Sequence, residues 1–252
     1  MKAFLKKAAA IALAVLMAAS ALAPGAFAAK SGTVTATNPA QVLRLGLRSG
    51  FGPLTIAKTT LHRGDTEEEV YLIAIGGAQL SLNQMNNYST FIASALSLPT
   101  VCLTMVINAA KATIPEGSKV MLIGHSVGGN IAQQFAAEIG MRKRYEIINT
   151  LACGSPVVLT LGREGQLHRL CDLQDPIPQI SLATLLNTFL HIGYEWSGML
   201  FKLQNPHGDS YYREDVWGGY DCLGVKGGDA YLTCNYADCV GFSLKLFPGS
   251  GA

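Results

Sequence analysis

Two stretches stand out in the pattern of apolar and polar positions, because each is apolar without a break: Val70–Ile75 and Val120–Ile123. Tyr145–Cys153 is a third apolar stretch of similar character. Strands that are buried on both faces have this composition, and they occur in parallel sheets covered by helices. Because helical segments separate these strands, the pattern predicts an α/β fold, a mostly parallel sheet with helices on both faces.

Further elements follow from the spacing of apolar positions. Leu54–His62 and Glu69–Ile75 are separated by the turn-forming Arg63–Thr66, which predicts a β-hairpin. Apolar residues in Leu80–Leu98 recur at helical spacing, which is typical of a helix packed on the core and is also compatible with a mobile lid. Val101–Ile107 is predicted to be a strand.

The rest of the chain gives shorter predictions. We expect a loose N-terminal segment over Ser31–Pro53 with a short helix near Ala40–Leu47, a connecting helix or turn over Gly162–Leu170, and a short strand over Leu170–Leu173. Thr188–Trp196 is predicted to be a strand, and Leu203–Tyr212 is predicted to be a loop.

The stretch Lys119–Gln134 contains the arrangement on which the functional prediction depends. Its apolar strand ends at Gly124, Ser126 follows, and Gly128 opens a segment that is helical in pattern to about Gly140. A strand, a sharp turn and a helix with serine at the turn form the G-x-S-x-G nucleophile elbow. Glycine at both flanking positions removes the Cβ atoms that would clash there. The turn exposes the serine hydroxyl and leaves the first helix amides free to stabilise an anion.

The first residues have the composition of a secretory leader. Three lysines precede an apolar, alanine-rich segment, Ala8–Ala23, and an A-x-A site follows at Ala26–Ala28. The apolar segment is shorter than the roughly 20 residues that span a membrane. We therefore expect residues 1–28 to be removed, no stable transmembrane segment to remain after processing, and a secreted chain starting at Ala29.

Charge and length describe the remaining chain, 29–252. The net charge of +2 includes the three leader lysines, so the processed chain would carry −1. No basic stripe remains that would indicate nucleic-acid binding. The length suits one α/β domain.

All six cysteines lie in this processed chain, and three of them fall in a glycine-rich segment from about residue 218 onward. An even number of cysteines in an exported protein predicts that most form disulfides, and we expect that segment to be a disulfide-tied extension. Buried free thiols are the alternative. No C-x-x-C pair occurs, so no metal site is expected.

A serine nucleophile needs a base, and the base needs an acid to orient it. In α/β-hydrolases the acid and then the histidine follow the serine along the chain. That order leaves Asp172 or Asp175 as the acid and His191 or His207 as the base. No cofactor is needed for this chemistry.

An oxyanion hole needs two backbone donors. The amide of Val127, directly after the nucleophile, is one candidate. The other should come from the loop after an upstream strand, where Gly76, Gly77 and Ala78 follow Val70–Ile75.

Four stretches, in the same order, resemble the class 3 lipases, the fungal-type triacylglycerol lipases and their bacterial and plant relatives. They are Gly124–Gly129, Leu151–Pro156, Asp175–Pro178 and Phe189–Trp196. A late histidine followed closely by a tyrosine, in Pro206–Tyr211, is also similar to the family. The family usually has Arg-Gly-Thr or Arg-Gly-Ser where this chain has Gly76-Gly77-Ala78.

The resemblance implies roles for single residues. Ser126 is implied as the nucleophile, Asp175 as the acid and His207 as the base, whereas His191 becomes a strand residue. Ala78 and Val127 match the two oxyanion positions. The resemblance thus implies a secreted α/β-hydrolase that cleaves acylglycerols or phospholipids. A short-chain esterase, an acyltransferase, and a binding protein that keeps the scaffold with a degraded site are the alternatives.

Overall fold

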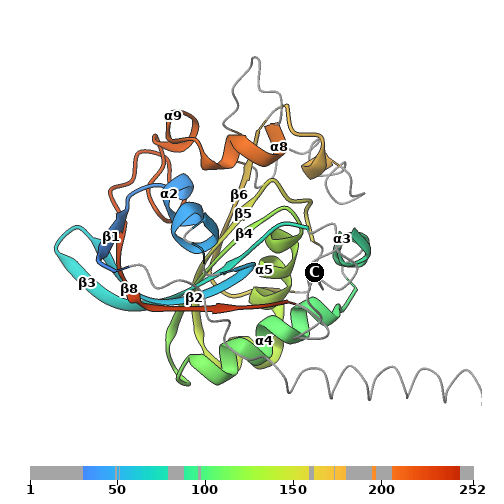
Figure 1. Ribbon diagram of the computed structural model, residues 1–252, viewed down its shortest axis with the longest axis horizontal. Coiled ribbons are helices and arrows are strands. Elements are labelled where there is room, and N and C mark those ends of the chain that lie inside the picture. Colours follow the sequence, from blue (N-terminus) through green and yellow to red (C-terminus); the bar gives the residue numbers. More distant parts are fainter. Residues whose placement is uncertain are drawn as a thin grey trace, which may run out of the picture.

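The computed structural model describes residues 31–48, 50, 52–78, 88–95, 98–158, 162–172, 174–179, 195–196 and 206–244. Within them the strands form one eight-stranded sheet in the order β1-β8-β2-β3-β4-β5-β6-β7 (Figure 1). The strands are β1 (Thr33–Ala36), β2 (Leu54–Arg63), β3 (Thr66–Ile75), β4 (Lys119–His125), β5 (Glu146–Cys153), β6 (Gln166–Cys171), β7 (Glu195–Trp196) and β8 (Tyr231–Phe242). The predicted leader lies outside these residues.

The sheet has an antiparallel part and a parallel part that meet at β3. Strands β1, β8, β2 and β3 pair antiparallel, and the predicted hairpin is confirmed as β2 and β3, with Leu54 opposite Ile75. Strands β3 to β7 pair parallel to their neighbours. The α/β class and the parallel pairing around the serine strand are thus as predicted, whereas the whole sheet is mixed.

Helices cover both faces of this sheet. They are α2 (Pro39–Leu43) with the π-helical η1 (Arg44–Arg48), α3 (Tyr88–Ala95), α4 (Val101–Thr113), α5 (Val127–Ala137), α6 (Ile139–Arg144), the 3-10 turns η2 (Ile177–Gln179) and η3 (Ser210–Tyr212), α8 (Pro206–Asp209) and α9 (Glu214–Trp217). None of these helices combines the length and the apolar character that crossing a bilayer requires.

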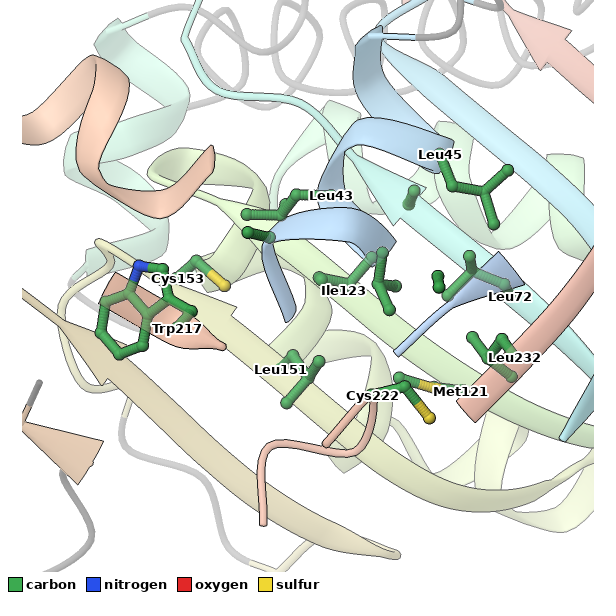
Figure 2. Packing of buried hydrophobic residues seen from close by; sticks show 14 of the residues in the cluster. Leu43, Leu45, Leu72, Met121, Ile123, Leu151, Cys153, Trp217, Cys222 and Leu232 are labelled. Carbon is green, nitrogen blue, oxygen red and sulfur yellow. The ribbon is translucent and has the colours of Figure 1, made fainter. Parts of the chain in front are cut away.

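Side chains of the central strands point alternately to the two faces of the sheet, and an apolar layer covers each face. On β4, Met121 and Ile123 enter the layer with Leu43 and Trp217, while their neighbours enter the layer under α4 and α5. Figure 2 shows the first layer, where side chains from α2, the central strands and the C-terminal third of the chain meet. Burial on both faces explains why these strands are apolar without interruption.

The strand predicted over Val101–Ile107 is wrong, because these residues begin α4. Thr100 caps the helix by accepting a hydrogen bond from the Leu103 amide. Buried positions recur at helical intervals through the whole segment: Cys102, Met105, Val106, Ala109 and Ala110. Few polar residues lie between these buried positions. The helical spacing is therefore not evident within the seven residues Val101–Ile107 alone.

Three further predictions need correction. Gly162–Leu170 is not a connecting helix or turn, since β6 begins at Gln166 and pairs with β5. Of the loop predicted over Leu203–Tyr212, the structure describes Pro206–Tyr212, and these residues form α8 and η3. The N-terminal segment contains β1 in addition to the short helix that was expected. Of the strand expected over Thr188–Trp196, only β7 is described, and His191 lies outside the described residues.

The C-terminal segment is not an appended extension. Strand β8 lies inside the sheet, paired with β1 on one side and β2 on the other. The predicted disulfides are also absent, since all six cysteines are free thiols. The sulfur atoms of Cys234 and Cys239 are 3.5 Å apart, a contact rather than the roughly 2.05 Å of a bond. Burial in the apolar layers accounts for thiols such as Cys102 and Cys153.

Candidate active site

Ser126 lies at the end of β4, where the chain turns into α5. Its φ of 57° is the one positive value of a non-glycine residue among those described. The Ser126 amide donates to the carbonyl oxygen of Cys153 at 2.9 Å, which ties the turn to the end of β5. A strained residue is retained only where the surrounding structure holds it. The predicted elbow is therefore present in its full context of strand, turn and helix.

The two glycines of the elbow are required by close backbone contacts. A Cβ atom at Gly124 would lie 2.2 Å from the carbonyl oxygen of Gly128, and one at Gly128 would lie 2.1 Å from that of Ile75. Both distances are far below van der Waals contact. The start of α5 is thus pressed against the ends of β3 and β4, and only glycine allows this approach.

His207, on α8, lies between Ser126 and Asp175. Its Nε2 atom is 2.9 Å from Ser126 Oγ. Its Nδ1 atom is 2.8 Å from Asp175 Oδ2. The three residues predicted as nucleophile, base and acid are therefore brought together in one hydrogen-bonded chain. A serine hydroxyl in contact with an imidazole that a carboxylate orients is the arrangement that activates serine as a nucleophile.

The two candidate acids have different partners. Asp175 is buried, and its Oδ1 accepts from the Ile177 amide at 2.9 Å. Asp172 is buried too, but its carboxylate accepts from the Gln174 amide and the Ser210 hydroxyl. Asp172 therefore fixes the loop and η3, while Asp175 is the carboxylate that contacts the histidine.

Tyr211 contacts the same oxygen of Asp175 that His207 contacts. Its hydroxyl donates to Asp175 Oδ2 at 2.7 Å and accepts from the Asp172 amide at 3.0 Å. Burial holds the pKa of Tyr211 well above its ordinary value, so the hydroxyl remains a donor. The sequence signal for this residue was the tyrosine closely following the late histidine.

His125, adjacent to the serine, contacts the backbone of His207. Its Nε2 atom lies 2.7 Å from the backbone carbonyl oxygen of His207, and the two rings are 4.9 Å apart. Burial, followed by the charge of His207, lowers the pKa of His125 to about 4. The ring is thus neutral near pH 7, and since a carbonyl only accepts, its Nε2 carries the proton. Sequence reasoning excluded His125 as the base but did not find this contact.

A cavity of about 610 Å³ opens over Ser126 and His207. Its lining is largely apolar, with Phe91 and Ile92 from α3 and Ile177 from η2. Arg48, His125, Gly208 and Tyr212 complete the wall together with Gly77 and Ala78. Helix α3 is fastened to α5 where Asn130 donates to the Ser94 hydroxyl at 3.0 Å. The sequence predicted a helix within Leu80–Leu98, and the described part of that segment is α3. This helix packs on α5 and also supplies part of the cavity wall.

Of the two residues predicted to supply the oxyanion hole, Ala78 lines this cavity, whereas Val127 is buried and is not one of the lining residues. Ala78 is the third residue after the end of β3. Val127 is the first residue of α5, and the amides of Gly129 and Asn130 both donate to the Ser126 carbonyl. An amide at the first helical position has no acceptor within its own helix. The oxyanion role of the two amides stays a prediction.

The described residues contain no group of three or more histidine, cysteine, aspartate or glutamate side chains that could hold a metal ion. Comparison of the chain with protein-family models, with curated proteins and with solved structures finds no match in any of the three.

Proposed function

We propose that this protein is a serine hydrolase of the α/β-hydrolase fold that cleaves carboxylic esters of lipids through an acyl-enzyme on Ser126. One observation carries the proposal: the continuous hydrogen-bonded chain from Ser126 through His207 to the buried Asp175. The class 3 lipase resemblance of the motifs supports the same reading. Strained backbone at the serine adds to it, because such strain concentrates at functional sites.

In the first half of the reaction, Ser126 Oγ attacks the ester carbonyl while its proton passes to His207 Nε2. Asp175 stabilises the imidazolium that forms. The carbonyl oxygen becomes an oxyanion, which the amides of Val127 and Ala78 would stabilise. When the tetrahedral intermediate collapses, the bond to the alcohol breaks, and His207 gives its proton to the leaving oxygen.

In the second half, a water molecule takes the place of the alcohol. His207 accepts a proton from this water as its oxygen attacks the acyl carbon. Collapse of the second intermediate releases the carboxylic acid, and the proton returns to Ser126 Oγ. Another alcohol in place of water would make the reaction an acyl transfer, so hydrolysis and transfer share every protein group.

A lipid substrate is supported by the wall of the cavity. Phe91, Ile92 and Ile177 give it an apolar surface suited to an acyl chain. Ile92 is 61% exposed, so most of its apolar side chain is in contact with water at this wall. An acyl chain lying against these residues would remove their surface from water. A short-chain esterase would gain less from this apolar wall.

An active-site-directed fluorophosphonate tests the nucleophile. We expect it to label the protein at Ser126, and Ser126→Ala to be neither labelled nor active. Loss of such a nucleophile typically lowers turnover by about 10⁶. Circular dichroism should be unchanged in the variant. A wild-type protein that is folded but not labelled would favour the binding-protein alternative.

The base is tested by His207→Ala and His191→Ala. We expect His207→Ala to be nearly inactive and His191→Ala to keep measurable turnover, because His207 is the histidine that contacts both Ser126 and Asp175. The reverse result would move the base to His191.

We further propose that the protein is exported after cleavage following Ala28. The intact mass of protein recovered from the medium should correspond to a chain starting at Ala29. Recovery of a chain that retains Lys2–Lys7 would contradict this proposal.

A further inference from the structure

The cavity over Ser126 has a single permanent charge among the described residues that line it. That charge is Arg48, at the end of η1. The other lining residues are glycine, alanine, apolar or neutral polar side chains and the two histidines. The positive charge of Arg48 also contributes to the low pKa of His125, so it acts within electrostatic range of the serine turn.

The structure holds the guanidinium of Arg48 in place without neutralising it. The guanidinium carbon lies 3.7 Å from the centre of the Tyr212 ring, so the group stacks on that ring. Among the described residues, the carboxylate paired with it is that of Asp209, at 3.9 Å, beyond hydrogen-bond distance. Both side chains are at least half exposed, and ion pairs of this kind contribute little in water.

Arg44, one helical turn earlier, provides the contrast. Its guanidinium donates to the Glu214 carboxylate and to the Tyr212 carbonyl, so it joins η1 to α9 and η3. The guanidinium of Arg44 thus donates its hydrogen bonds to protein groups. The guanidinium of Arg48 instead stacks on Tyr212 at the wall of the cavity. The N–H groups of a guanidinium lie in its own plane, so stacking on a ring leaves them available to two oxygens of one anion.

We propose that Arg48 binds an anionic group of the substrate, a phosphate or a carboxylate, while the ester carbonyl lies at Ser126. This inference rests on the proposed function and narrows it: the substrate class becomes acidic lipid esters, in preference to neutral acylglycerols. The apolar wall at Phe91 and Ile92 takes the acyl chain, and Arg48 takes the charged part of the same molecule.

Three esters with the same oleoyl chain test the proposal: 1-oleoylglycerol, 1-oleoylglycerol 3-phosphate and oleoylglyceric acid. They are neutral, phosphorylated and carboxylated, so the two anionic arms separate the possible sources of charge. The proteins are wild type, Arg48→Gln, Arg48→Lys and Arg63→Gln. Arg63 is an exposed arginine at the β2–β3 turn, paired with Glu68, and serves as the control.

We expect wild type to have the higher kcat/KM for at least one anionic ester. Arg48→Gln should lower that value by about 10- to 100-fold, mainly through KM, because a charge-assisted hydrogen bond is lost. The neutral ester should be affected little. Arg48→Lys should recover part of the loss, and Arg63→Gln should match wild type.

Two results would overturn the inference. One is equal loss on neutral and anionic esters in Arg48→Gln, which would make Arg48 a structural residue. The other is a wild type that does not prefer either anionic ester. In both cases the neutral ester is still cleaved and Ser126 is still labelled, so the proposed function survives. Failure of labelling and of all three hydrolyses would instead overturn the hydrolase proposal and this inference with it.

Discussion

The ring of His125 donates a hydrogen bond from Nε2 to the backbone carbonyl oxygen of His207, 2.7 Å away. The residue next to the serine thus holds the backbone of the residue that contacts the serine hydroxyl. Two elements far apart in sequence, β4 and α8, are joined at this point by one neutral imidazole. Burial lowers the pKa of His125 to about 4, so the ring is neutral near pH 7 and makes this contact without carrying a charge.

The first prediction concerns pH. Because His125 has a lower pKa in the folded protein than the ordinary 6.5, the unfolded chain binds a proton that the folded one excludes. Stability is therefore full above about pH 6.5 and falls as the pH drops toward 4, by about 2–3 kcal/mol from this residue. His125→Gln should be less stable at pH 7.5, but its free energy of unfolding should fall less between pH 7.5 and 4.5.

Urea unfolding at a series of pH values measures this difference. His168→Gln, on β6, is the control and should keep the parent's pH dependence. If His125→Gln lost stability with acid as steeply as the parent, His125 would not be the buried neutral group described above.

A second prediction concerns Tyr211. Tyr211→Phe removes a donor to Asp175 and leaves the buried amide of Asp172 without its acceptor. Leaving such a group unpaired costs about 1–3 kcal/mol, so the melting temperature should fall. Turnover should fall several-fold with little change in KM, because Asp175 loses a contact that orients it. A variant with wild-type turnover would show that His207 is oriented without the tyrosine.

Third, we expect Gly128→Ala to be strongly destabilised. The new methyl group would lie 2.1 Å from the Ile75 carbonyl oxygen, which cannot move without shifting the end of β3. Overpacking of this kind costs about 1–3 kcal/mol or more. Gly219→Ala is the matched control, since nothing lies within 4 Å of its added Cβ. Thermal unfolding compares the two, and equal melting temperatures would argue against the tight elbow.

The cysteines give a fourth prediction. In the native protein Cys239 should react with a thiol reagent first, because it is the least buried of the six and its pKa is lowered by a hydrogen bond from Cys234. Burial raises the pKa of Cys102 to about 12 and also raises the pKa of Cys153 and Cys222. Cys239→Ser should remove the fast phase.

In denaturant without reductant, all six cysteines should be alkylated. Intact mass counts the added groups. Fewer than six would mean that the isolated protein contains disulfides.

Local features were predictable from the sequence because their causes lie close together in the chain. The elbow needs glycine at Gly124 and Gly128 on either side of Ser126, and the β2–β3 hairpin needs only its turn residues. The order of serine, acid and histidine then restricted the other two site residues to a few candidates. Asp175 and His207 were found in this way together with the family resemblance.

Contacts between distant segments could not be predicted in the same manner. Nothing near Arg48 in the sequence indicates Tyr212, on which it stacks, and nothing near His125 indicates the carbonyl of His207. Helix α4 was mistaken for a strand because its first residues are nearly all apolar. Such a run is compatible with the spacing of a buried strand and with that of a buried helix. Strand β8 was missed because its partners, β1 and β2, lie near the other end of the chain.

The position of β8 has a consequence for how the chain is made. Both of its partners precede it in the chain, and among the described strands β1 pairs only with β8, so β1 lacks this neighbour until residues 231–242 have been translated. Pairing across such a sequence separation is slow, because a long loop must close before any contact forms. Until then, the open edge of β2 is a site where another chain can pair. A ribosome stalled before Tyr231 would therefore hold a nascent chain that contains Ser126, Asp175 and His207 but lacks the strand that completes its sheet.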